Sequence, residues 1–173
     1  EIAKAVKEHH ANFGTVVVMD PNTGDVLALA NYPSYNPNEP PTDKASFEAR
    51  KNLAVMAPFE PGSVFKVITL SAAFETTNLR PETMFHCGNG SFTLFRRVIH
   101  DAHPYGMLSA ADILAKSSNI GAIKIGLMAG NENLYNYVKK FGFGERTGIP
   151  LPGEGRGVVR KLDKWIASSI GSV

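Results

Sequence analysis

Residues 60–78 read EPGSVFKVITLSAAFETTN and are apolar on nearly every side of a helix. A helix with no polar face is buried at the centre of a domain. The turn residues Pro61-Gly62 precede it, so we expect the helix to begin near Ser63. Lys66 is the one charged residue in its first two turns, and lysine is rarely buried without a reason.

Ser63 and Lys66 are three residues apart and therefore share one face of this helix. A serine hydroxyl is a weak nucleophile that needs a neighbouring base. Burial lowers the pKa of a lysine and makes its neutral amine available as that base, while the helix N-terminus favours developing negative charge. The pair has the composition of a serine–lysine nucleophile, although a capping serine and a solvated lysine would give the same spacing.

The preceding segments predict a short helix over residues 1–10 and then a β-hairpin. TVVVMD (15–20) and DVLALA (25–30) are rich in strand-forming residues and flank the turn PNTG. Their continuous apolar character predicts that helices cover both faces of the hairpin. Four prolines in residues 31–42 predict a surface loop, and residues 44–56 are weakly helical.

The segments that follow predict a small irregular β region over residues 80–107, with the β-like runs SFTLF and RRVIH, and then three helices. The first helix begins at Ser109, which forms a capping box with Asp112. The third is capped by Asn131 and ended by Gly142. Its buried stripe consists of Leu134, Tyr137, Val138 and Phe141.

Ser117-Ser118-Asn119 interrupts the helical pattern between the first and second of these helices. A hydroxyl and an amide two residues apart in such a break can face one cleft, and the asparagine amide offers both a donor and an acceptor. The same residues commonly cap helices, and the tripeptide alone favours that interpretation.

The order S-x-x-K, then S-x-N about fifty residues later, is the pattern of penicillin-binding proteins. Four flanking segments strengthen the match: EPGSVFK (60–66), GTVVVMDPNTGDVLALANYPSYNPN (14–38), IHDAHPYGMLSAADILAKSSNIGAIKIG (99–126) and FGFGERTGIPLPGE (141–154). From about Phe13 to Val173 the chain resembles the class B high-molecular-weight penicillin-binding proteins, the monofunctional transpeptidases of cell division and elongation. The resemblance implies an α+β fold of the transpeptidase and serine β-lactamase kind, with a central antiparallel sheet flanked by helices.

That resemblance implies a role for each matching residue. Ser63 would be the acylated nucleophile, Lys66 its general base, and Ser117 a proton shuttle that also positions Lys66. Asn119 would bind the backbone of the substrate, and the Ser63 N–H would form half of the oxyanion hole. The implied substrates are peptidoglycan stem peptides, β-lactams would acylate Ser63, and no cofactor or metal is implied.

The third motif of the family, K-T-G on a strand, does not occur in the 173 residues. Because WIASSIGSV (165–173) resembles the segment before a further helix, we expect residues 1–173 to be the N-terminal portion of a transpeptidase domain, with both ends cut and little activity alone. The resemblance also implies a membrane-anchored parent, a catalytic domain outside the cytoplasmic membrane, and division or elongation proteins as partners.

Composition and spacing exclude other classes of function. The net charge is +2 without a basic block, so we expect no nucleic-acid binding. Cys87 is the only cysteine and is expected to be a small buried residue, and His100-Asp101-Ala102-His103 fits no usual metal-ligand spacing. Two alternatives stay open: a class D-like serine β-lactamase, which S-x-N and the LPGE loop disfavour, and a non-catalytic β-lactam sensor or scaffold domain.

Overall fold

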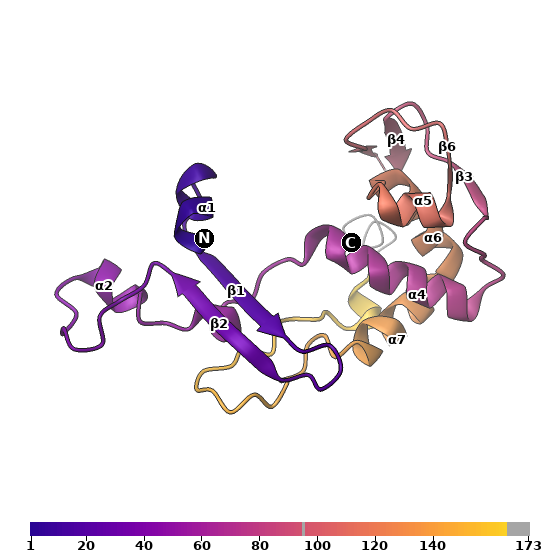
Figure 1. Cartoon of the computed structure of the whole chain (residues 1–173). Helices are drawn as coiled ribbons and strands as arrows, with labels where there is room; N and C mark the ends of the chain where they lie inside the picture. Colours follow the sequence, from indigo (N-terminus) through magenta and orange to yellow (C-terminus); the bar gives the residue numbers. More distant parts are fainter. Residues whose placement is uncertain (95, 166–173) are drawn as a thin grey trace. The chain divides into compact units, whose positions relative to one another are not determined.

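The computed structural model describes residues 1–94 and 96–165, in two compact units (Figure 1). The first unit consists of Glu1–Phe59 and Arg146–Arg156, and the second of Glu60–Glu145 and the described residues from Gly157 onward. Phe95 of the predicted run SFTLF and residues 166–173 of WIASSIGSV lie outside the described part of the chain. Each unit mixes helices with small antiparallel sheets, so the predicted α+β class is confirmed.

The first unit is built on the predicted hairpin. Strands β1 (Gly14–Met19) and β2 (Val26–Tyr32) are antiparallel, and their pairing runs from Gly14 opposite Tyr32 to Met19 opposite Val26. The Asp20 carboxylate accepts a hydrogen bond from the Asn22 backbone N–H at 2.7 Å, which stabilises the connecting turn. The helices of this unit are α1 (Ile2–Glu8), α2 (Lys44–Glu48) and α3 (Leu53–Met56).

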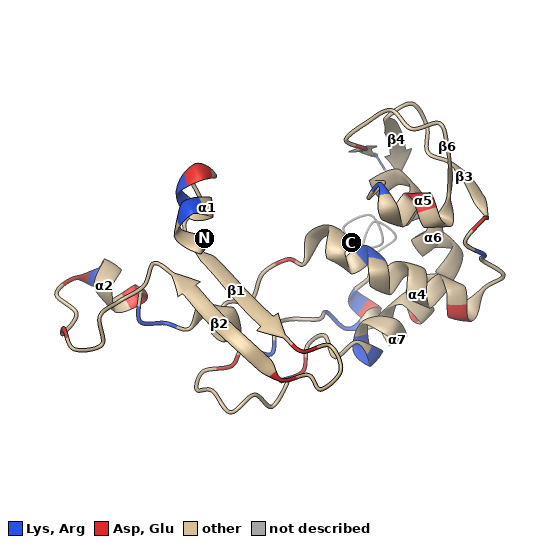
Figure 2. Cartoon of the chain, in the orientation of Figure 1, with Lys and Arg blue, Asp and Glu red and all other residues tan. Residues whose placement is uncertain are grey.

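Helices cover the hairpin only in part, contrary to the prediction that they cover both of its faces. Consecutive strand residues point to opposite faces, yet Val17 and Val18 are 43% and 45% exposed and Leu27 is 66% exposed. Figure 2 shows that β1 and β2 carry no charged residue, which is the pattern that suggested burial. The prediction was wrong within this unit because α1 and α3 are too short to cover two strands of six and seven residues.

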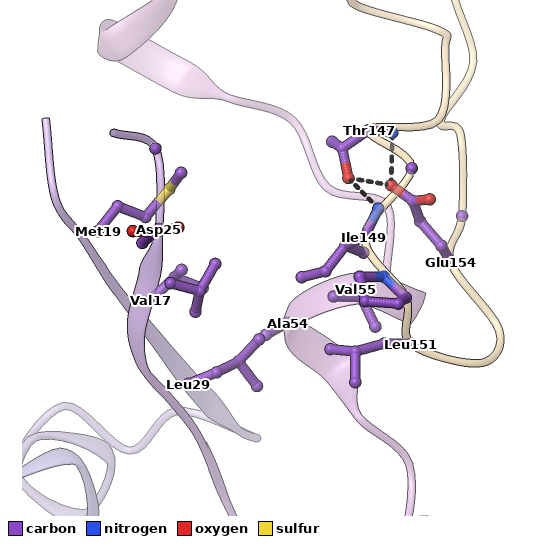
Figure 3. A pocket seen from close by; sticks show the side chains of 15 residues that line it. Val17, Met19, Asp25, Leu29, Ala54, Val55, Thr147, Ile149, Leu151 and Glu154 are labelled. Atoms are coloured by element: carbon purple, nitrogen blue, oxygen red, sulfur yellow. Dashed lines mark hydrogen bonds between the residues drawn. The ribbon is translucent and has the colours of Figure 1, made fainter. Parts of the chain in front are cut away.

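One face of the hairpin borders an apolar groove inside the same unit. The groove has a volume of about 810 Å³, and Figure 3 shows Val17 and Leu29 on one side of it and Val55 and Leu151 on the other. At its polar edge the Glu154 carboxylate accepts hydrogen bonds from the backbone N–H and the hydroxyl of Thr147, both at 2.6 Å. These bonds hold the loop that forms one wall of the groove.

The second unit surrounds a central helix, as the sequence predicted. Helix α4 (Lys66–Thr76) packs against α5 (Ala110–Ala115), α6 (Asn119–Ala129) and α7 (Asn131–Lys140). The predicted β region forms two separate antiparallel pairs, β3 (Met84–His86) with β6 (Met107–Ser109) and β4 (Ser91–Leu94) with β5 (Arg97–His100). Short 3₁₀ turns, η1 (Gly62–Phe65) and η2 (Leu162–Lys164), complete the described elements. Cys87 is fully buried, as predicted.

The central helix is less completely buried at its start than its composition suggests. It begins with η1, and Val64 and Val67 are 70% and 47% exposed. Phe65 instead enters the core, where its ring meets that of Phe143 edge to face at 5.6 Å. The first turn therefore presents one side to solvent, and Ser63 lies on this open end.

Helix α7 differs from its prediction at its start and in one residue of its buried stripe, whereas Gly142, with φ +80° directly after the C-cap Phe141, ends it as predicted. Gly130 is the N-cap, so Asn131 is the first helical residue and its side chain makes no capping bond. Leu134 and Val138 are buried, but Phe141 is 49% exposed because the helix ends at Lys140 and the helical spacing does not reach it. The box at Ser109 and Asp112 is confirmed, with reciprocal side-chain to backbone bonds. Among the described residues, no helix has the length and apolar character needed to span a membrane.

Candidate active site

Ser63 and Lys66 meet at the junction of η1 and α4. Lys66 Nζ donates to Ser63 Oγ at 3.0 Å. A 3₁₀ turn has three residues per turn, so side chains at positions i and i+3 lie directly above one another. The tight turn that begins at Gly62 thus aligns the hydroxyl with the amine more closely than an α-helical turn would.

Lys66 is enclosed although it carries an ionisable amine. Its side chain is buried and only 3% of the residue is exposed. Nζ lies within hydrogen-bond distance of three further oxygens: the Ser117 carbonyl at 2.7 Å, the Ser117 hydroxyl at 2.8 Å and Asn119 Oδ1 at 2.7 Å. The structure therefore brings the four predicted site residues together, across 51 and 53 residues of sequence.

The kinds of oxygen around Nζ determine where a neutral amine would point its lone pair. The Ser117 carbonyl and Asn119 Oδ1 can only accept, so they take the two N–H bonds of a neutral amine. The two remaining neighbours are hydroxyls, which can donate. The lone pair of neutral Lys66 is thus left facing the Ser63 and Ser117 O–H groups, which is the arrangement that a base needs.

Burial also favours that neutral form. Desolvation lowers the pKa of Lys66 below its ordinary value, and the negative charge of Asp101 opposes the shift without cancelling it. In the described residues, the surroundings of Lys66 supply acceptors but no carboxylate in contact with Nζ. The amine is therefore held by neutral dipoles rather than by an ion pair.

The turn at Ser117 is what aims two oxygens at Lys66. Ser117 has φ +56°, in the left-handed region that residues other than glycine seldom adopt. Ser118 is fully buried, and its Oγ caps α6 by accepting the Gly121 N–H at 3.0 Å. The helix break predicted from the sequence is therefore both a cap and a site element.

Both the oxygen and the nitrogen of the Asn119 side-chain amide are hydrogen-bonded within the protein. Oδ1 accepts from Lys66, and Nδ2 donates to the His100 carbonyl at 2.9 Å. The orientation of the amide is unambiguous, because one neighbour is a donor and the other is an acceptor. Its expected contact with a substrate backbone stays a prediction.

The model of the penicillin-binding protein transpeptidase domain matches residues 14–173. The chain belongs to this family. Over 165 residues, or 95% of its length, it is 36% identical to the probable peptidoglycan D,D-transpeptidase PenA of Neisseria flavescens, of which it covers 40%. It is 35% identical to the penicillin-binding protein PbpB of Mycobacterium tuberculosis, with 92% of this chain and 23% of that protein covered. The chain thus spans less than half the length of these curated relatives.

Solved structures agree with this assignment to the transpeptidase family. The transpeptidase domain of penicillin-binding protein 3 from Burkholderia pseudomallei superposes with a TM-score of 0.82 at 32% identity, covering 98% of this chain and 46% of that one. Penicillin-binding protein 3 from Mycobacterium tuberculosis gives 0.83 at 34% identity, with 98% and 38% covered. The predicted fold of the penicillin-binding transpeptidase kind is confirmed.

The candidate site contains one residue that sequence reasoning missed. Asp101, considered only as a member of an unconvincing metal set, accepts hydrogen bonds from the turn that follows Ser117. In the described part of the chain, no group of three or more histidine, cysteine or acidic side chains could hold a metal ion. Nothing in the local pattern marks Asp101, because its partners lie 17 to 19 residues further along the chain.

Proposed function

We propose that this chain is the nucleophile-bearing, N-terminal part of a peptidoglycan D,D-transpeptidase domain. The observation that carries the proposal is the buried Lys66 amine, 3.0 Å from the Ser63 hydroxyl and held by Ser117 and Asn119. The naming of relatives as peptidoglycan D,D-transpeptidases supports the choice of substrate. The parent protein would be a serine-type enzyme of peptidoglycan synthesis, acting in cell division or cell shape.

In the proposed acylation, Ser63 Oγ attacks the carbonyl carbon of a D-Ala-D-Ala peptide bond. Neutral Lys66 takes the hydroxyl proton, either directly or through Ser117, so that an alkoxide need not form free in solution. The C–N bond then breaks, and the proton passes to the departing amine. The products are an acyl ester on Ser63 and free D-alanine.

In the second half-reaction, the amine of a neighbouring stem peptide attacks the ester carbonyl and loses a proton to the site. The C–O bond to Ser63 breaks, the serine recovers its proton, and a new peptide bond cross-links the two stems. A β-lactam would acylate Ser63 in the same way, but its leaving nitrogen stays attached to the acyl group. The acyl-enzyme would then persist, which makes β-lactams the proposed covalent ligands.

The setting of the reaction is also a proposal. We infer a membrane-anchored parent with the transpeptidase domain on the outer side of the cytoplasmic membrane, because peptidoglycan is assembled there. Division or elongation proteins in the same membrane would be its partners. This setting rests on membership of the transpeptidase family alone.

Labelling with a fluorescent penicillin tests the proposal in the full-length protein that contains this sequence. We expect stoichiometric, long-lived label on the wild type and none on Ser63→Ala, with Ser71→Ala on the same central helix as a control that keeps its label. Label that survives Ser63→Ala contradicts the nucleophile assignment. Rapid loss of label by hydrolysis would indicate a β-lactamase, and a folded protein that never becomes labelled would indicate a sensor or scaffold domain.

A further inference from the structure

We propose that Asp101 is a positioning residue of this site, which holds the Ser117–Asn119 turn in the conformation that Lys66 needs. This inference rests on the proposed function, because its effect is exerted on the serine–lysine pair. Asp101 itself does not contact Ser63 or Lys66 through any hydrogen bond of the described structure. It acts through the backbone and side chains between them.

The Asp101 carboxylate accepts three hydrogen bonds from consecutive residues of the turn. Oδ2 accepts from the Ser118 hydroxyl at 2.6 Å, and Oδ1 accepts from the backbone N–H of Asn119 at 2.5 Å and of Ile120 at 3.1 Å. These two N–H groups belong to the first turn of α6, where backbone donors have no partner within the helix. The charge of Asp101 also lies at the positive end of this helix, which strengthens all three contacts.

The hydrogen bonds of Asp101 explain how Ser117 can keep its left-handed φ. A left-handed φ at a serine is unfavourable by itself and persists only where the surroundings determine it. Asp101 fixes the chain on the C-terminal side of Ser117, and α5 fixes it on the other side, where the Ser117 N–H donates to the Leu114 carbonyl at 3.1 Å. With both sides fixed, the carbonyl and the hydroxyl of Ser117 stay directed at Lys66.

His100, the residue before Asp101, contributes a further hydrogen bond to the same turn. The His100 carbonyl accepts from Asn119 Nδ2 and so orients the amide whose oxygen contacts Lys66. Adjacent residues at the end of β5 therefore hold both of the elements that surround the amine. A change at Asp101 is expected to reach Ser117 and Asn119 together.

The negative charge of Asp101 has a separate effect on Lys66, since it raises the pKa that burial lowers. The other charged groups on the helices packed against α4 are engaged elsewhere or lie at the surface. Lys116 of α5 lies over the Tyr105 ring, Lys124 of α6 donates to the His86 carbonyl, and Lys139 of α7 pairs with Glu145. The further charged residues of these helices are Asp112, which caps α5, and Glu132 and Lys140 of α7.

Two substitutions distinguish the effect of the Asp101 hydrogen bonds from the effect of the Asp101 charge. Asp101→Asn keeps an oxygen for the two backbone N–H groups and places an amide beside Ser118, whose hydroxyl can accept as well as donate, so it removes mainly the charge. Asp101→Ala removes both. Asp112→Asn is the matched control, because Asp112 also caps a helix of this unit but makes no hydrogen bond to the Ser117–Asn119 turn among the described residues.

Two measurements are made on the full-length protein. The first is the rate constant of acylation by a fluorescent penicillin as a function of pH. The second is the reactivity of the Cys87 thiol, followed by peptide mass spectrometry. Cys87 reports on the turn because its thiol is buried: burial and the Asp101 charge raise its pKa, while the Ser118 hydroxyl lowers it. For Asp101→Ala we expect the plateau rate to fall about tenfold or more and Cys87 to react faster than in Asp101→Asn, which lacks the same charge. For Asp101→Asn we expect most of the plateau rate to remain. The acid limb, where the acylation rate falls because Lys66 becomes protonated, should move to lower pH, because the charge that raises the pKa of Lys66 is lost. Asp112→Asn should change neither.

A plateau rate for Asp101→Ala within twofold of the wild type would overturn the positioning role. An unmoved acid limb in Asp101→Asn would overturn the effect of its charge. If the wild type is not acylated at all, the proposed function fails, and the Cys87 reactivity still tests the positioning role. Because the loss of the Asp101 charge by itself lowers the pKa of the Cys87 thiol, the comparison is between Asp101→Asn and Asp101→Ala, and equal rates in these two variants would refute the role.

Discussion

Gly121 offers a test in which two well-known effects of one substitution oppose each other. Gly121→Ala within α6 should stabilise the helix by about 1 kcal/mol, because alanine has the higher helix propensity. A Cβ at this position, however, would lie 2.4, 2.6 and 2.9 Å from Cγ1, Cδ1 and Cγ2 of Ile113. Three contacts below 3 Å with one side chain require either that side chain or the helix to move.

Neither movement is easy, so the clash should prevail over the propensity. Ile113 is fully buried, and an extra methyl group in a packed core costs about 1–3 kcal/mol. After subtracting the gain in propensity of about 1 kcal/mol, we expect the free energy of unfolding to fall by up to about 2 kcal/mol. With a urea dependence of about 2 kcal/mol/M, the midpoint of unfolding should drop by up to roughly 1 M.

Gly121→Ala in an Ile113→Ala background shows whether the clash with Ile113 causes the loss of stability. Ile113→Ala removes all three clashing atoms and by itself should cost about 2–5 kcal/mol. In that background Gly121→Ala should stabilise the protein, so the sign of its effect reverses. Gly106→Ala is the matched control, because an added Cβ there meets no atom within 4 Å, and its midpoint should stay at the wild-type value.

Two results would refute this reasoning: a raised midpoint for Gly121→Ala alone, or an equal loss in both backgrounds. The first would mean that the core accommodates the methyl group, and the second that Ile113 is not its cause. Because the Gly121 N–H donates to Ser118 Oγ, we also expect a shifted α6 to slow acylation of Ser63. Labelling by penicillin therefore measures the same displacement at the site.

Two further predictions concern the oxygens that surround Lys66. Ser117→Gly should leave the protein more stable than Ser117→Ala by about 1 kcal/mol, since φ is +56° and both variants lack the hydroxyl; equal urea midpoints would contradict a strained backbone. Asn119→Asp places a carboxylate where Oδ1 contacts Lys66 at 2.7 Å, so the pKa of Lys66 should rise and the acid limb of acylation should move to higher pH. A limb that stays in place, in a variant with unchanged circular dichroism, would show that Lys66 is not the group that titrates.

Local patterns in the sequence were sufficient for the main elements, whereas the candidate residues were selected by those patterns together with the resemblance to penicillin-binding proteins. Helical spacing located the central helix, a turn between two apolar runs located the hairpin, and the box at Ser109 and Asp112 located the start of α5. The pairing of Ser63 with Lys66 also follows from three residues of spacing. The helix, the capping box and the Ser63–Lys66 pair depend on interactions within about four residues, and the strands of the hairpin are joined by a short turn, so a linear pattern records all of them.

The tertiary structure alone decided which groups enclose Lys66 and what holds them. Its contacts to Ser117 and Asn119 join residues more than 50 positions apart, and Asp101 reaches the same turn from the end of another strand. Exposure was decided in the same way: the apolar strands of the hairpin lie open, while the charged Lys66 is buried. The physical reason is that burial and hydrogen-bond partners depend on which surfaces meet, and residue type and local spacing do not specify that.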